Sequence, residues 1–324
     1  MTSENNSLLL NLQEVDKTTG EVVKLDVNST STVQPVALMR LGLFVPTLKS
    51  TGKSKANRKN VTDATEELVQ LSIAKSEGYT DVKITGSRLD MDTDFKVWLG
   101  IIRSMSEYGV KSDTLELSFV EFVKMCGFDS RRSNKKMRDR ISNSLFKLAS
   151  VTLKFQSETK GWTTHLVQSA YYDINEDIVE IKAEPKLFEL YHMDRRVLLR
   201  LKAIDALQRK ESAQALYTYI ESLPPNPAPI SMKRMRDRLN LTSNVYTQNH
   251  TVRKAMEQLR DIGYLDYTEF KRGRATYFSV HYRNPKLISG PVKVPRNEEE
   301  EKAPEQNYDE VIKALKAAGI DPLK

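Results

Sequence analysis

The sequence predicts an α+β protein in which one arrangement, two helices followed by a β-hairpin, occurs twice along the chain. Two stretches show this order, Ser231–Arg283 and Leu115–Tyr172, and Lys and Arg are concentrated in both. Two helices followed by a basic hairpin are typical of a winged helix, which places one helix in the major groove of DNA. We therefore expect two tandem winged-helix domains with disordered N- and C-terminal tails.

The C-terminal stretch has the clearer helical pattern. Ser231 is a good N-cap for a first helix over Met232–Asn240, because its hydroxyl can accept a hydrogen bond from an unpaired N–H of the first turn. Apolar residues at helical spacing predict a second helix over residues 249–262. Gly263 can end that helix in a left-handed conformation without a Cβ penalty.

The hairpin of this stretch carries positive charge at its tip. β-branched and aromatic residues predict strands over Tyr264–Phe270 and Ala275–Tyr282, joined by the turn Lys271-Arg272-Gly273-Arg274. The whole stretch Ser231–Arg283 holds eleven Lys and Arg against five Asp and Glu. We expect these cations on the helix surfaces and on the hairpin, where phosphates would lie.

The N-terminal stretch repeats this pattern. Ser118 and Glu121 have the spacing of a capping box at the start of a short helix. A second helix is expected from Arg132 to Ala149, followed by hairpin strands Val151–Gln156 and Thr164–Tyr172. Residues 131–154 hold eight Lys and Arg against one acid, so the positive charge of the protein is concentrated in two places.

The rest of the chain suggests four parts. Val33–Pro46 is apolar, and its prolines favour extended edge strands over a helix. The expected parts are a disordered N-terminal arm (1–32), an N-terminal winged-helix domain for DNA binding and dimerisation (33–183), a C-terminal winged-helix domain for repeat recognition (184–285) and a polar tail (286–324).

Composition indicates a soluble protein of a reducing compartment. The net charge of +7 and the pI near 9.2 suit a nucleic-acid partner. The single cysteine, Cys126, cannot form an intramolecular disulfide, and no apolar stretch approaches the roughly 20 residues of a membrane helix. The N-terminus also lacks the pattern of a signal peptide, so we expect a cytoplasmic protein.

Motifs for catalysis are incomplete. Gly52-Lys53-Ser54 ends like a phosphate-binding loop, but the glycine required five positions earlier is Thr47. Asp90, Asp92 and Asp94 alternate like calcium ligands, but the sixth and twelfth positions of the loop do not fit. Acids at a helix N-terminus are stabilised by the helix dipole, which favours a structural role for them. The four histidines are scattered, so we expect no enzyme activity, no metal and no cofactor.

Six segments resemble a known family: VQPVALMRLGLFVPTLKS (33–50), TDATEEL (62–68), RLDMDTDFKVWLGII (88–102), HLVQSAYYD (165–173), KESAQALYTYIESLP (210–224) and VRKAMEQLRDIGYLDYTEFKRGR (252–274). They look like the replication initiators of IncFIB-type plasmids, within the iteron-binding initiator family. The resemblance covers about Val33 to Pro285.

The resemblance implies a function and a set of partners. Members of this family bind one double-stranded origin repeat as a monomer, with a helix of each winged-helix domain in a major groove. Their dimers form through the N-terminal domain and repress the protein's own promoter, which contributes to copy control, and host chaperones shift dimer to monomer. The resemblance therefore implies plasmid origin DNA, the own promoter, a second copy of the chain and host replication proteins as partners, and no membrane.

Carried over by residue, the resemblance gives two DNA-binding sets. The set of the N-terminal helix is Arg131, Arg132, Asn134, Lys135, Lys136 and Arg138. The set of the C-terminal helix is Asn249, His250, Arg253 and Lys254, with Lys271, Arg272 and Arg274 of the hairpin on the DNA backbone.

Two other functions remain open. A winged-helix transcriptional repressor would use the same DNA site, but a dimeric repressor does not need a second basic domain in one chain. A nicking replication enzyme would need a metal-bound histidine pair beside a nucleophilic tyrosine, and the sequence has no His-x-His pair. The sequence therefore favours a non-enzymatic replication initiator that binds origin repeats.

Overall fold

The structure is a computed structural model of the 324-residue chain. The chain divides into a compact unit of residues 1–289 and a second unit of residues 290–324, and every described residue lies in the first. The described residues are 13–15, 22–24, 27–47, 61–63, 79–108, 114–129, 134–173, 175–185, 187, 190–191 and 196–284. Several sequence predictions lie outside these ranges: Arg131, Arg132, the segment Gly52–Ser54, the tail 286–324 and most of the arm 1–32.

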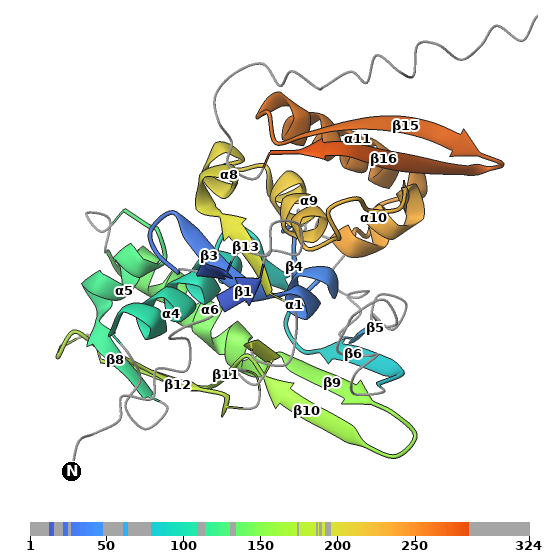
Figure 1. The fold of residues 1–324 in the computed structure, drawn as a ribbon. Helices are drawn as coiled ribbons and strands as arrows, with labels where there is room; N and C mark the ends of the chain where they lie inside the picture. The colour runs from blue at the N-terminus through green and yellow to red at the C-terminus, as the bar shows by residue number, and fades with distance from the viewer. Residues whose placement is uncertain are drawn as a thin grey trace, which may run out of the picture. The chain divides into compact units, whose positions relative to one another are not determined.

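Within the C-terminal half, the described residues 211–283 form three helices and a three-stranded antiparallel sheet. Its elements in chain order are α9 (Glu211–Glu221), β14 (Ile230–Ser231), α10 (Met232–Leu239), α11 (Val245–Asp261), β15 (Leu265–Arg272) and β16 (Ala275–Arg283). The strand order is β14-β16-β15. The free end of the β15–β16 hairpin projects away from α9 and α10 (Figure 1). Apolar side chains from α11, such as Val252, Met256 and Leu259, are fully buried and hold this helix in place.

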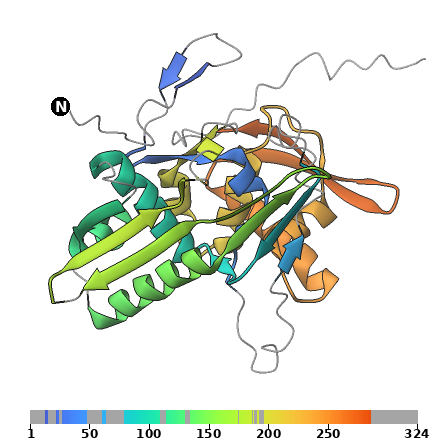
Figure 2. The ribbon, with the colours of Figure 1, turned by 90° about the horizontal axis from the view of Figure 1, so that it is seen from below.

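The N-terminal half has the same order of elements with one insertion. The elements are α4 (Asp94–Tyr108), β8 (Thr114–Ser118), α5 (Phe119–Met125), α6 (Lys135–Ser150), β9 (Thr152–Gln156), β10 (Gly161–His165), β11 (Val167–Asp173) and β12 (Ile178–Ala183). Its three-stranded antiparallel sheet has the order β8-β12-β11, and α6 runs alongside β11 (Figure 2). In both halves a short strand precedes the helix pair and pairs with the second strand of the hairpin.

This comparison corrects the predicted hairpin of the N-terminal half. The expected single strand Thr164–Tyr172 is two strands, β10 and β11, which separate at Leu166. Strands β9 and β10 pair with each other in a different sheet, of order β10-β9-β6-β5, with β6 (Asp81–Thr85) and β5 (Val61–Asp63). The hairpin that corresponds to β15–β16 is β11–β12. Local propensity marks both segments as strands, whereas their sheet partners depend on the tertiary fold.

The segment between residues 27 and 47 packs against both halves. It forms β3 (Ser31–Pro35), α1 (Val36–Arg40) and β4 (Phe44–Val45), so the expectation of extended strands without a helix is wrong for residues 36–40. Pro35 occupies the N-cap of α1, a position that does not need a donated N–H. β3 pairs with β13 (Arg196–Arg200), which leads into α8 (Leu201–Ala206), and β4 pairs in parallel with β7 (Leu89–Asp90).

A buried polar group shows how this segment joins the two halves. Gln34 of β3 is fully buried, and its side-chain oxygen accepts hydrogen bonds from the Trp98 indole of α4 at 2.9 Å and from the Tyr191 hydroxyl at 3.1 Å. Arg40 of α1 donates to the carbonyl of Ser222, just after α9. Residues on both sides of the predicted boundary at 183/184 therefore share a core, and the division into two domains stays a prediction.

The described parts of the predicted N-terminal arm, residues 1–32, include strands. Strands β1 (Gln13–Val15) and β2 (Val22–Lys24) pair with each other, and β3 begins at Ser31. Three of the six residues in β1 and β2 are valines, which have a high β-propensity. These strands were not predicted from the sequence because the arm as a whole is polar.

Candidate nucleic-acid interface

Helix α11 begins four residues earlier than the sequence pattern predicted. Asn244 is its N-cap, and the side-chain oxygen of Asn244 accepts a hydrogen bond from the N–H of Thr247 at 2.9 Å. The extra turn brings two large apolar side chains to the surface: Val245 is 58% exposed and Tyr246 is 85% exposed. An aromatic side chain with so little protein contact at a helix start is available for a partner.

The predicted readers lie on the face of α11 that the core leaves uncovered. His250 and Lys254 are exposed, and neither forms an ion pair with another described residue. Asn249 is partly buried, and its side-chain oxygen is enclosed without a hydrogen-bond partner among the described residues. These three side chains and Tyr246 form a polar and aromatic surface along the first half of α11.

Arg253 differs from its neighbours because it is held by the hairpin. Its guanidinium makes a two-pronged contact with the carboxylate of Glu269 on β15, with Nε at 2.9 and 3.0 Å from the two oxygens and Nη2 at 2.7 Å from Oε1. The side chains are 43% and 31% exposed. The helix and the hairpin are therefore joined by an ion pair at the centre of the candidate interface.

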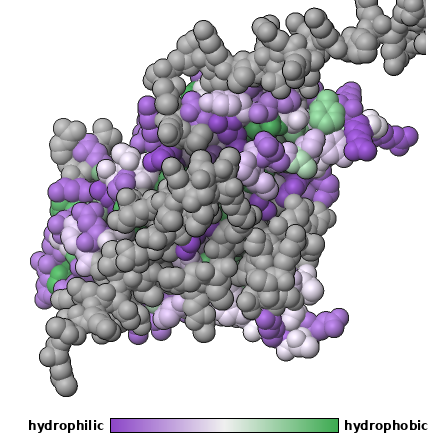
Figure 3. All heavy atoms as spheres, viewed as in Figure 1, coloured by the Kyte–Doolittle hydropathy of each residue, from purple (hydrophilic) through white to green (hydrophobic). Residues whose placement is uncertain are grey.

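The end of the β15–β16 hairpin carries the expected cations. The turn is shorter than predicted, because pairing continues to Arg272 and Ala275, and Gly273 adopts a φ of +61° that a glycine tolerates without strain. Lys271, Arg272 and Arg274 are exposed and form no ion pair within the described part of the chain. The hydrophilic colour gathers at this free end in Figure 3.

Several cations counted in this stretch have structural roles instead. Arg238 is only 4% exposed, and it donates to the carbonyls of Met39 and Phe44. Arg283 donates to the carbonyls of Ile220, Leu223 and Pro224. The expectation that the cations of Ser231–Arg283 lie on the surface is therefore wrong for Arg238, which is buried.

Helix α6 of the N-terminal half presents a second basic surface. Asn134 is its N-cap and accepts a hydrogen bond from the N–H of Met137 at 3.1 Å, so its side-chain oxygen is already used. Lys135 and Lys136 are exposed, and no described residue forms an ion pair with them. Arg138 lies over the ring of Phe119, 5.3 Å from its centre. These residues leave the first turn of α6 strongly positive.

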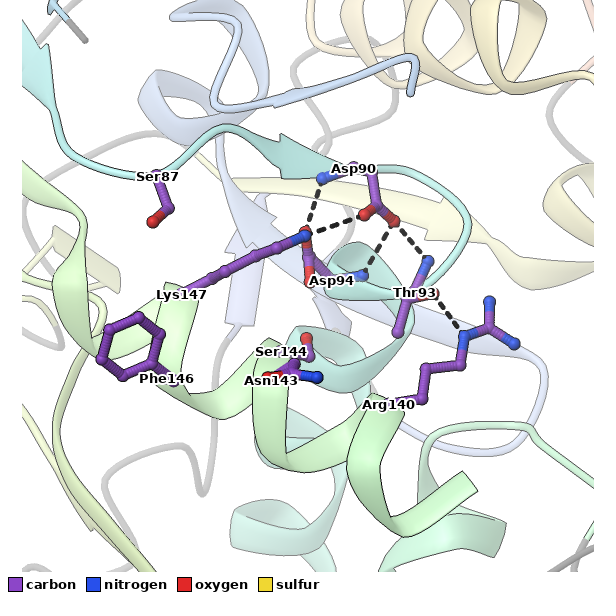
Figure 4. Close-up of a pocket in the computed structure, with 9 residues that line it drawn as sticks. All are labelled: Ser87, Asp90, Thr93, Asp94, Arg140, Asn143, Ser144, Phe146 and Lys147. Atoms are coloured by element: carbon purple, nitrogen blue, oxygen red, sulfur yellow. Dashed lines mark hydrogen bonds and ion pairs between the residues drawn. The ribbon is translucent and has the colours of Figure 1, made fainter. Parts of the chain in front are cut away.

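Further along α6, two cations face the start of α4 and line a pocket of about 540 Å³ (Figure 4). Lys147 Nζ lies 3.1 Å from Asp90 Oδ2 and 2.7 Å from Asp94 Oδ2, and Arg140 Nε donates to the hydroxyl of Thr93 at 2.6 Å. Asp90 also closes the turn just before α4, because its Oδ1 accepts from the N–H of Thr93 at 2.7 Å and from that of Asp94 at 3.3 Å. Asp90 and Asp94 therefore contact Lys147 of α6, and a structural role in place of a metal site stays a prediction.

Burial gives one acid of this motif an unusual pKa. Desolvation, with the nearby charge of Asp90, raises the pKa of Asp94 from 3.8 to about 6, and the hydrogen bond from Lys147 opposes that rise. Burial would raise the pKa of Asp90 as well, but the N–H of Thr93 and the charge of Lys147 bring that pKa below its ordinary value. The carboxylates of Asp90 and Asp94 pair with Lys147 and so connect β7 and α4 to α6. These contacts restrain the orientation of α6, whose first turn is basic.

The remaining polar residues show no metal site. Among the described residues, no group of three or more His, Cys, Asp and Glu is arranged to hold a metal ion. His165 Nδ1 lies 3.3 Å from the hydroxyl of Thr152, and His281 Nε2 lies 2.6 Å from that of Thr268, so each histidine joins two strands of one hairpin.

Within the described ranges, no helix has both the length and the apolar composition needed to cross a membrane.

The sequence is similar to that of known replication initiators. Residues 82–221 match the family described as Initiator Replication protein, WH1. The chain is 58% identical over 291 residues to RepFIB replication protein A of Escherichia coli (strain K12), across 89% of this chain and 88% of that protein. It is 54% identical over 314 residues to Replication protein RepA of Salmonella typhi, across 96% of this chain and 90% of that one.

Identity at this level over nearly all of both chains defines the class of protein: the chain is a plasmid replication initiator. Within that class it belongs to the family of RepFIB replication protein A, as the six sequence segments indicated. Among solved structures, the crystal structure of domains 2 and 3 of RctB aligns with a TM-score of 0.45 and 12% identity, over 77% of this chain and 98% of that one.

Sequence reasoning missed three residues of the candidate interface. Val245 and Tyr246 were placed before the second helix, although Asn244 is a favoured N-cap residue directly before the apolar Val245, a signal that could have moved the predicted start. Glu269 was assigned no role, because the pattern of a strand does not show which helix residue its side chain meets. The predicted DNA-binding residues remain predictions, with Arg131 and Arg132 outside the described ranges.

Proposed function

We propose that the chain is a sequence-specific DNA-binding initiator that recognises origin repeats, or iterons, of its plasmid with two winged helices. In this proposal α11 and α6 each enter a major groove on one face of the DNA, and the protein binds one repeat as a monomer. The lysines and arginines of the β15–β16 hairpin then contact phosphates beside the groove read by α11.

One observation carries this proposal. The two halves share an order of elements and an order of strands, β8-β12-β11 and β14-β16-β15. Each presents the exposed side of its second helix, with lysines that form no ion pair with a described residue. Lys135 and Lys136 mark this side on α6, and Lys254 marks it on α11. A repeated fold with a basic helix surface in each copy suits one long DNA site better than two unrelated ligands.

The same chain has further proposed partners. We propose that a dimer, formed through the N-terminal half, represses the protein's own promoter, and that the monomer recruits host replication proteins to the origin after host chaperones shift dimer to monomer. The support is membership in the initiator family. We also propose that the chain has no catalytic activity and needs no cofactor, so that opening and copying of the origin depend on the recruited proteins.

The deciding experiment is a footprint of the purified protein on the DNA that flanks its own gene, at fixed salt. The expected result is protection of tandem repeats at low protein concentration, with no protection when the repeats are scrambled. Protection of a single inverted repeat, without tandem repeats, would favour a transcriptional repressor. Equal protection of cognate and scrambled DNA would contradict sequence-specific binding.

A metal-dependent nicking assay on a supercoiled plasmid carrying the origin tests the absence of catalysis. The expected result is that the plasmid stays supercoiled. Nicking that is lost on replacement of one tyrosine would identify the protein as a nicking enzyme and contradict the proposal.

A further inference from the structure

We propose that Glu269 of β15 is a positioning residue for DNA recognition, because it orients the guanidinium of Arg253 so that the free edge of that group can read a base. This inference rests on the proposed function. It assigns a role in sequence preference to an acidic residue of the hairpin that does not itself touch the DNA.

The geometry divides the donors of Arg253 into two sets. A guanidinium has five N–H donors in a planar fork: one on Nε, two on Nη1 and two on Nη2. Glu269 accepts from Nε and Nη2, along the side of the fork. Nη1 donates to no described residue, so the outer edge, formed by Nη1 and the second hydrogen of Nη2, is free. That edge can donate two parallel hydrogen bonds to guanine O6 and N7.

The ion pair is not needed to hold α11 against the hairpin. Its side chains are 43% and 31% exposed, and pairs with this exposure contribute little to stability. About two turns further along α11, Arg260 also connects this helix to β15. Its Nε lies 3.2 Å from Asp266 Oδ1, and its guanidinium carbon lies 4.0 Å from the centre of the Tyr267 ring. The distinct effect of Glu269 is to restrict the orientation of Arg253.

Charge supports the same role. Glu269 lies on the strand that ends in Lys271 and Arg272, where a carboxylate opposes binding of any phosphate backbone. Such a residue lowers affinity for all DNA sequences alike, unless it improves a contact that depends on sequence. A carboxylate that fixes an arginine for one base pair raises the ratio of specific to non-specific affinity, because it lowers the ordering entropy of the contact.

The test compares Arg253→Ala, Glu269→Ala, Glu269→Gln and the double Ala variant on a cognate repeat, on repeats with one base pair changed, and on scrambled DNA. Arg253→Ala should lose about five- to 150-fold in preference at one base pair, the range for one bidentate contact. Glu269→Ala should lose about fivefold at the same base pair, the lower end of that range, without weaker binding to scrambled DNA. The double variant should discriminate no less than Arg253→Ala.

Glu269→Gln and one further variant, Asp266→Ala, serve as controls. Glu269→Gln keeps an oxygen that accepts from the guanidinium, so it should retain more preference than Glu269→Ala, and it replaces that variant if the Ala protein does not fold. Asp266→Ala removes the neighbouring Arg–carboxylate pair and should leave base preference unchanged, because Arg260 stays stacked on Tyr267 and bonded to its carbonyl.

The outcomes separate this inference from the proposed function. Wild-type protein that binds cognate and scrambled DNA equally would overturn both. If the wild type discriminates, the inference fails alone when Glu269→Ala leaves base preference unchanged or relaxes a different base pair. Relaxation at the base pair that Arg253 reads, with the Gln variant intermediate, supports it.

Discussion

Replacement of Arg238 by Met should destabilise the protein strongly, although Arg238 belongs to a stretch that the sequence marks as DNA-binding. Its side chain is 4% exposed, with Nε 3.2 Å from the Met39 carbonyl oxygen and Nη1 3.0 Å from the Phe44 carbonyl oxygen. Nη2 also donates to the Thr218 hydroxyl at 3.3 Å. Methionine replaces the unbranched stem of arginine but has no donor, so these contacts are lost together.

The size of the effect follows from the groups left behind. Met39 and Phe44 are both buried, and a buried acceptor that loses its donor costs about 1–3 kcal/mol. Two such carbonyls would lower the free energy of unfolding by about 2–6 kcal/mol. Removing the guanidinium also removes the cost of burying a charge, which offsets part of the loss, so we expect about 2–4 kcal/mol.

The matched control is Lys233→Met on the exposed side of the same helix, α10. Lys233 pairs with Asp237 at 3.0 Å, and the two side chains are 63% and 58% exposed, so its loss should cost less than about 0.5 kcal/mol. Urea unfolding followed by circular dichroism measures both variants. The reasoning is refuted if Arg238→Met unfolds within about 1 kcal/mol of the control, well below the penalty for orphaned buried carbonyls.

Three further predictions concern other sites. Asp94→Asn should gain stability relative to wild type as pH rises from about 4 to 7, by up to about 1.4 kcal/mol per unit of pKa shift. The reason is that the folded wild type holds the Asp94 proton more tightly than the unfolded chain does, so the wild type loses stability as that proton leaves. A constant difference in the free energy of unfolding across this pH range, measured with urea, would contradict the raised pKa. Arg272→Ala should weaken binding to cognate and scrambled DNA alike and flatten the log–log salt dependence by about one unit, so a loss confined to cognate DNA in a salt titration would contradict its phosphate role. Tyr246→Ala should lower cognate affinity without changing the free energy of unfolding, since the side chain is 85% exposed; equal affinity for both proteins would mean that Tyr246 makes no contact with DNA.

Elements with strong local signals could be predicted from the sequence. Ser231 caps α10, with its hydroxyl 3.1 Å from the N–H of Arg234, and Ser118 caps α5 in the same way at 3.2 Å. Gly263 follows α11 with a φ of +72°. Caps and left-handed glycines depend on a few neighbouring residues, so single-sequence reasoning can locate them.

Features set by distant contacts could not be predicted. Strand β9 and residues 164–172 were predicted as extended, but which strand pairs with β8 is decided by packing across the fold. Arg238 and Lys254 are both cations on predicted helices of the same stretch. Arg238 contacts the carbonyl of Met39, 199 positions away in the sequence, whereas Lys254 is exposed to solvent. Nothing in the composition distinguishes these two kinds of cation. The sequence therefore predicted that α6 and α11 carry exposed cations, but it did not show which arginines of the same stretch are buried.

This difference between cations sets the salt dependence expected of the protein. Six of the predicted DNA-binding residues in the described part of the chain are exposed cations without an ion pair: Lys135, Lys136, Lys254, Lys271, Arg272 and Arg274. If each neutralises one phosphate, the log–log salt slope from these residues is about −5, since each contact contributes about −0.9. Arg253 adds nothing to that slope while Glu269 balances its charge, and Arg238 adds nothing because it is buried. A protein that used only the hairpin and α11 would have four such cations and a slope of about −3.6, so the slope itself reports whether α6 also contacts the DNA backbone.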